Sequence, residues 1–128
     1  RDPTPGPDEI WCRCDGGPFG FLSIAGHAHA DALSVELRFG GVDILADPGT
    51  YCYHVYPEWR SYFRSTRAHN TIEIDGADQA EQSGPFNWAQ HADAETLRVA
   101  GLDGIGREDG FIVIGCGALV SKASEAVT

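Results

Sequence analysis

Alternating apolar and polar residues form short runs along most of the chain. The clearest run is LSVELR at residues 33–38, where three apolar side chains alternate with three polar ones. Successive side chains of a strand point to opposite faces, so this run predicts a strand with one buried and one solvated face. The pair Gly40-Gly41 separates it from a second apolar run that ends at Asp47. A glycine pair between two apolar runs predicts a β-hairpin.

Other segments complete an all-β pattern. Further short strands are predicted at residues 9–14, 19–24 and 69–75, twice within 84–102, and at 109–120. Residues 57–64 have the only compact helical pattern, and we expect a short helix or a structured loop there. Three prolines within residues 1–8 indicate a linker or an irregular entry. Many short strands with almost no helix predict an antiparallel β-sandwich, or part of one.

Length, composition and charge limit the classes of function. The chain has 128 residues, which is enough for one domain with a single core. It begins at Arg1 and contains no methionine, so we expect a piece or a processed product of a longer chain, and no localisation follows. The formal net charge of -10 speaks against binding to nucleic acid or to an anionic membrane surface. No apolar run approaches the roughly 18 residues of a membrane-spanning helix, so no membrane insertion is expected.

Arginines and cysteines add further limits. Three of the nine basic residues, Arg60, Arg64 and Arg67, lie close together in the sequence. They either bind an acidic ligand or balance nearby acids and pack on aromatic rings, and the sequence leaves both readings open. The four cysteines include no CxxC pair. This spacing supports neither a zinc ribbon nor a disulfide framework, and we expect buried free thiols.

The histidines cluster in the middle of the sequence, and three of them have a context that indicates a site. His27 and His29 are two residues apart, so in an extended segment their side chains project to the same side. Hairpin pairing brings Asp47 back beside the residues that precede the first strand, and His69 begins the next predicted strand. Two histidines and a carboxylate that leave one position open are a common pattern of catalytic zinc sites. The other two histidines, His54 and His91, have no such context and are expected to be ordinary surface or loop residues.

Three sequence blocks carry a resemblance to a known family: GHAHADALSVELRFGGVDILADPGTYCYH at residues 26–54, WRSYFRST at 59–66 and AHNTIEIDGADQAEQSGPFNW at 68–88. In order and spacing they resemble the C-terminal β-sandwich region of heparinase II/III-like polysaccharide lyases. The resemblance covers roughly residues 12–98, which implies a sandwich segment over 9–103 and leaves 104–128 as a C-terminal strand or tail. Enzymes of this family join such a sandwich to an N-terminal (α/α) toroid. They cleave uronic-acid-containing polysaccharides by β-elimination between the two domains.

The resemblance also implies roles for individual residues. These are zinc ligation by His29, Asp47 and His69, and catalysis by His27 with Tyr51 or Tyr53. The chemistry of a uronate substrate adds Arg60 and Arg64 as candidates for binding sugar carboxylates, because a guanidinium group can bind a carboxylate bidentately. The zinc then braces three loops and orients His27, rather than acting as a Lewis acid. In this family the main proton-abstracting tyrosine, and the asparagine or histidine that neutralises the carboxylate, belong to the toroid. The implied partners are therefore an acidic polysaccharide and a toroid domain.

Two other classes of function fit part of the same pattern. One is a non-catalytic carbohydrate-binding or scaffold sandwich in which a metal ion only stabilises the fold. The other is a metal-dependent hydrolase or oxygenase that uses His27 and His29 together as ligands. The second alternative predicts an exchangeable metal position and activity in the isolated domain, whereas the lyase reading predicts neither.

Overall fold

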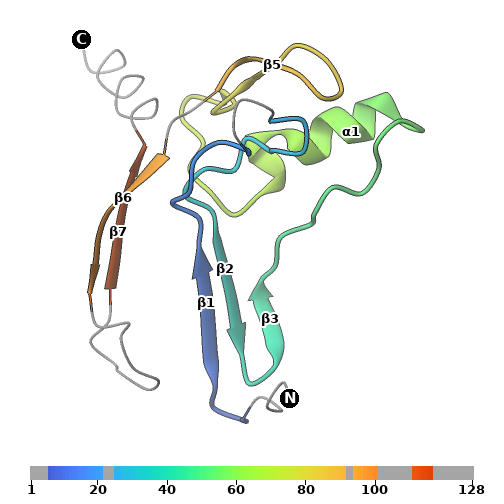
Figure 1. Ribbon diagram of the computed structural model, residues 1–128. Helices are drawn as coiled ribbons and strands as arrows, with labels where there is room; N and C mark the ends of the chain where they lie inside the picture. Colours follow the sequence, from blue (N-terminus) through green and yellow to red (C-terminus); the bar gives the residue numbers. More distant parts are fainter. Residues whose placement is uncertain (1–5, 22–24, 92–93, 101–110, 117–128) are drawn as a thin grey trace.

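Antiparallel strands and one short helix make up the structure, a computed structural model that describes residues 6–21, 25–91, 94–100 and 111–116 (Figure 1). The elements are β1 (Ile10–Cys14), β2 (Val35–Phe39), β3 (Val42–Leu45), α1 (Pro57–Arg64), a 3₁₀ turn η1 (Thr66–Ala68), β4 (Glu81–Gln82), β5 (Trp88–Gln90), β6 (Ala94–Ala100) and β7 (Phe111–Cys116). They form the sheets β1-β2-β3, β4-β5 and β6-β7, all antiparallel. The predicted all-β class and the short helix at 57–64 are thus confirmed. No helix in the described ranges has the length and apolar character needed to cross a bilayer.

The hairpin predicted at Gly40-Gly41 is present and joins β2 to β3. Both glycines have positive φ angles, 53° and 83°, which most other residues avoid. A Cβ atom on Gly40 would also lie 2.5 Å from the carbonyl oxygen of Pro7. β3 ends at Leu45 rather than at the predicted Asp47, which lies in the extended loop that follows. The loop still carries Asp47 toward the start of β2, as the hairpin prediction requires.

The β1-β2-β3 sheet shows the features of an incomplete sandwich. Its polar side chains form ion pairs across the strands, Arg13 with Glu36 at 2.6 Å and Arg38 with Asp43 at 2.7 Å. Large apolar side chains of β3 remain exposed, among them Val42 at 64%. An apolar sheet face needs a covering layer, so this arrangement is consistent with part of a sandwich.

The thiols that the structure describes are free, as the sequence predicts, but they are not buried. Cys12 is exposed, and Cys14 and Cys52 are half-buried. Cys12 and Cys14 pair with Leu37 and Val35 of β2. Their exposure is consistent with a sheet that no second layer covers within the described part of the chain.

The strand predicted at residues 69–75 is wrong, and the strand predicted at 19–24 lies only partly within the described residues. Residues 69–73 are irregular, and only Ile74 forms an isolated bridge, with Ala77, around the predicted turn at residues 75–76. Side chains of this segment form hydrogen bonds to neighbouring loops, and the segment does not pair with a strand within the described ranges. The Thr71 hydroxyl donates to Ala32 O at 2.5 Å, and the Asn70 amide donates to Ala46 O at 2.9 Å. In the predicted strand at 19–24, residues 19–20 form bends and 22–24 lie outside the described residues.

A network of polar residues, rather than an apolar core, connects the loops at one end of the β1-β2-β3 sheet. Figure 1 shows α1 and these loops gathered at that end. The buried Thr66 hydroxyl donates to Ala30 O at 2.8 Å and accepts from the Gln79 N–H at 2.8 Å. The buried Gln79 amide donates to Ala32 O at 3.1 Å and to Ile72 O at 2.9 Å. Buried polar groups with such partners fix the loops that carry the candidate site.

Candidate functional site

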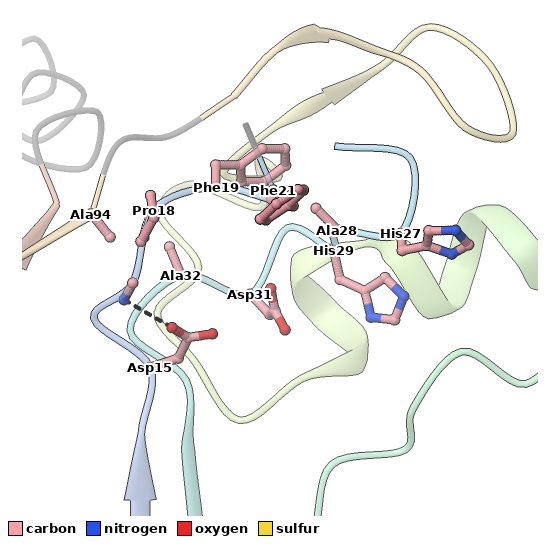
Figure 2. A pocket seen from close by; sticks show the side chains of 12 residues that line it. Asp15, Pro18, Phe19, Phe21, His27, Ala28, His29, Asp31, Ala32 and Ala94 are labelled. Carbon is pink, nitrogen blue, oxygen red and sulfur yellow. Dashed lines mark hydrogen bonds between the residues drawn. The ribbon is translucent and has the colours of Figure 1, made fainter. Parts of the chain in front are cut away.

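His27 and His29 lie on a loop that is anchored at its next residue. The N–H of Ala30 donates to Arg64 O at 2.9 Å, and Ala30 O accepts from Thr66 as described above. His27 is exposed and His29 is half-buried. Figure 2 shows the two rings leaving the loop in a similar direction. The sequence prediction that both rings share one side therefore holds, although the segment is a loop and not a strand.

The structure brings together the three residues predicted to ligate zinc. Asp47 Oδ2 lies 2.5 Å from His69 Nδ1, and the ring centroids of His29 and His69 are 5.1 Å apart. The Thr50 hydroxyl lies 3.4 Å from His29 Nε2. The His69 side chain is fully buried, whereas that of Asp47 keeps a quarter of its exposure. The three residues come from separate segments, so a shared ion would connect all of them.

A second carboxylate, which the sequence reasoning missed, also belongs to this cluster. His29, Asp31 and His69 each offer a ligand atom, and these atoms all lie within 4.8 Å of one another. The signal was present in the sequence as HAHAD, where Asp31 continues the two-residue spacing of the histidines. Neither His27 nor Asp47 is a member of this group of described residues, but Asp47 contacts one of its members, His69.

The contacts of His69 suit a metal ligand. Its Nε2 lies 3.0 Å from Phe63 O, and a carbonyl oxygen only accepts hydrogen bonds, so Nε2 carries the proton. Nδ1 faces a carboxylate oxygen of Asp47, which also only accepts hydrogen bonds, so a proton on Nδ1 makes this contact and a metal ion would have to displace that proton. A backbone carbonyl that fixes the ring tautomer in this way is typical of metal-binding histidines. Two imidazole nitrogens with one or two carboxylates are a donor set that zinc accepts.

The charges at the cluster also suit a cation. Burial, with the positive charges of His69 and Arg60, lowers the pKa of His29 to about 4, so its ring is neutral at neutral pH. Burial acts to raise the pKa of Asp47. The hydrogen bonds from His69 and from the Gly49 N–H outweigh burial and lower it. Metal binding requires neutral imidazoles and ionised carboxylates, and the fold favours these states at His29 and Asp47.

A cavity of about 320 Å³ opens beside this cluster. His27, His29 and Asp31 line one part of it, and Asp15 and Phe19 line another (Figure 2). Burial raises the pKa of Asp31. The cavity therefore gives the histidine pair access to solvent and to small ligands.

The two candidate tyrosines have different surroundings. Tyr51 has a φ of 59°, and its ring packs against Phe63, with the ring centroids 5.1 Å apart. Tyr53 contacts His27 edge-to-face, with the ring centroids 5.6 Å apart. Tyr53 is thus the tyrosine beside the histidine predicted to be catalytic, a choice that the sequence left open.

The arginines predicted to bind substrate lie inside the fold. Arg60 and Arg64 are 1% and 0% exposed, and both guanidinium groups donate to backbone carbonyls. Arg64 donates to Gly84 O at 2.6 Å and stacks on Trp88, with 4.1 Å between its Cζ and the ring centroid. This burial does not favour direct contact of either guanidinium group with a substrate, because their N–H donors bond to the backbone: those of Arg64 to Gly84 and Asn87, and those of Arg60 to Gly26 and Pro85. Arg67 is exposed and pairs with Glu73 at 2.9 Å, so it balances an acid.

Comparison with known proteins gives one result. The model of the family described as "Heparinase II/III-like, C-terminal" matches residues 6–117. No curated protein matches the chain, and no solved structure does. The match spans most of the chain and includes every residue of the cluster described above. The chain therefore belongs to the heparinase II/III-like C-terminal family.

Proposed function

We propose that this chain is the zinc-binding C-terminal domain of a polysaccharide lyase and supplies part of the active site. The proposed reaction is β-elimination on a uronic-acid-containing polysaccharide. Family membership supports the enzyme class, and the contact of the exposed His27 ring with Tyr53 is the observation that carries the active-site role. An exposed imidazole beside a phenol, next to a buried ligand cluster, places two proton-transfer groups at the surface.

The chemistry of elimination explains why these residue types are suited to the site. A uronate loses its C5 proton, its carboxylate must be stabilised as charge develops, and the 4-O leaving group needs a proton. His27 and Tyr53 can each hold or deliver a proton at the edge of the domain. The remaining groups are expected from the (α/α) toroid, the partner domain that the C-terminal family implies. This chain therefore provides one wall of a shared cleft.

The metal has a bracing role in this proposal. His29, Asp47 and His69 would hold the zinc, with Asp31 in reach as a further donor. A bound zinc ion would supply a link among three segments: the 25–31 loop, the loop after β3 and the segment after η1. His27 is two residues from His29, so fixing one ring orients the other.

The proposed function is tested by comparing the complete protein with the isolated 128-residue chain. The complete protein should release unsaturated uronate from an acidic polysaccharide, measured by its ultraviolet absorbance. The isolated chain should bind about one zinc ion and release no such product, because the toroid groups are absent. Product from the pure isolated chain would contradict the shared active site. Zinc binding without product from the complete protein would favour the scaffold alternative.

The two carboxylates of the cluster give a separate prediction. Asp47→Asn and Asp31→Asn should each bind zinc about 10- to 100-fold more weakly, because an amide oxygen is a poorer ligand than a carboxylate. The amide in Asp47→Asn would also be a poorer partner for His69. Titration with a competing chelator measures this effect in the complete protein. Asp8→Asn, an exposed position outside the cluster, is the matched control.

For each variant, one result would contradict the proposed role of the residue that it replaces. Unchanged affinity in Asp31→Asn or in Asp47→Asn would remove that residue from the ligand set. A changed preference among polysaccharides in Asp47→Asn would count against a bracing role, because a brace does not contact the substrate.

A further inference from the structure

A second cavity, of about 480 Å³, lies next to His27 but on residues that the cluster does not use. Its lining includes Tyr53, Arg60, Ser61, Gln82 and Phe86. The His27 ring contacts both aromatic residues of this cavity: its centroid lies 5.6 Å from that of Tyr53 and 6.4 Å from that of Phe86. A ligand in the cavity would therefore be adjacent to the proposed catalytic histidine.

The aromatic pair provides walls that suit a sugar ring. Tyr53 and Phe86 are nearly parallel, with an interplanar angle of 16° and ring centroids 6.1 Å apart. They are 42% and 41% exposed, so their faces remain partly open to solvent. The C–H groups of a pyranose form an apolar face that packs well on an aromatic ring. Ser61 and Gln82 add polar groups at the cavity, as ligand sites that orient a polar molecule require.

Arg60 supplies the charge and fixes the two walls. Its Nη2 donates to Gly26 O at 3.2 Å and its Nε to Pro85 O at 3.1 Å, which are the residues before His27 and Phe86. Its guanidinium carbon lies 5.1 Å from the ring centroid of Tyr53 and 5.3 Å from that of Phe86. The third nitrogen, Nη1, is buried and has no hydrogen-bond partner among the described residues. No ion pair with an acidic side chain balances the charge of Arg60 among the described residues, so this positive charge favours an anion in the cavity that Arg60 lines.

We propose that this cavity is a subsite for one acidic sugar ring of the polysaccharide, bound next to His27. Tyr53 and Phe86 pack on the ring, and the positive charge of Arg60 favours its carboxylate or sulfate group. The inference rests on the proposed function for the reaction at His27, but the binding itself does not require turnover. Phe86 sets the affinity of the subsite and is not a catalytic residue.

The test uses Phe86→Ala in the complete protein. The KM for the acidic polysaccharide should rise about tenfold, the loss expected for one aromatic contact, while kcat and zinc content stay close to those of the wild type. Phe86→Trp should restore the KM because it restores an aromatic face. Phe39→Ala is the matched control, since Phe39 is 47% exposed on β2 and lies outside the cavity.

Calorimetry separates this inference from the proposed function. The probes are a hexuronate tetrasaccharide, its carboxyl-reduced form and a sulfated neutral tetrasaccharide, each titrated into the complete protein and its Phe86→Ala variant. Weaker binding of an acidic probe in the variant supports the subsite, even if the wild type forms no unsaturated product. The probe that binds better than the reduced form identifies carboxylate or sulfate as the preferred group. Unchanged KM and unchanged binding in Phe86→Ala, in a protein that does form product, would overturn the subsite and leave the proposed function intact.

Discussion

His29→Ala in the complete protein is expected to remove the zinc and to lower the stability of the domain at the same time. The His29 ring lies beside His69 and within reach of Asp31, so its loss leaves the remaining donors too few for tight binding. An ion that binds only the folded state stabilises it by mass action, by about 2.7 kcal/mol at 100 times its Kd. The variant should lose that contribution. Metal content by elemental analysis, and calorimetric unfolding with and without added zinc, measure the two effects.

His54→Ala is the control for this experiment. His54 is exposed and lies outside the ligand cluster of the described residues, so the variant should keep both its zinc and its response to zinc. If His29→Ala retained stoichiometric zinc, the ligand set proposed above would be wrong. If it lost zinc without any change in unfolding, the ion would bind without stabilising the fold.

His27→Ala should have the opposite pattern: full zinc content and a loss of turnover of about 10²- to 10⁴-fold, the usual contribution of a general acid or base. His27 is exposed and lies against Tyr53, and it is not among the described residues that gather around the possible ion. The rate of formation of unsaturated uronate and the metal content are measured on the same preparation. Tyr51→Phe is a suitable comparison, because the Tyr51 ring packs on Phe63 and should contribute little to turnover.

The outcome that would contradict this division is loss of zinc in His27→Ala. The first histidine would then be a ligand, and the arrangement would be closer to a hydrolase or oxygenase site with both histidines on the metal. Unchanged zinc and unchanged turnover would instead place His27 outside the chemistry and favour a scaffold role for the domain.

Elements with a strong local signal could be predicted from the sequence, and those that depend on distant contacts could not. The hairpin at Gly40-Gly41 and the helix α1 are specified within a few residues, by positive φ angles and by helical spacing. The alternation in residues 69–75 has the same form as that of β2, yet this segment is irregular. Its Thr71 and Asn70 side chains bond to loops more than 20 residues away, which local periodicity does not reveal.

The same distinction between local signals and distant contacts applies to the residues of the candidate site. Hairpin geometry predicted Asp47 beside the residues that precede the first strand, His29 among them, and the family resemblance added His69, which Asp47 contacts in the structure. The sequence prediction did not include Asp31, although the two-residue spacing of His27 and His29 continues through it. The burial of Arg64 could not be predicted, because exposed and buried arginines look alike in a sequence. The choice of Tyr53 over Tyr51 depends on side-chain packing between loops.

The Thr66 hydroxyl, which connects Ala30 O with the N–H of Gln79, has a consequence for how an ion would bind. These bonds connect the chain beside His29 with the chain beside His69 through groups of the protein itself. The entropy of ordering these segments is therefore lost when the domain folds, and not when the metal arrives. We therefore expect the proposed zinc site to be preorganised. Zinc removed by a chelator should leave a folded domain that takes the ion back without refolding.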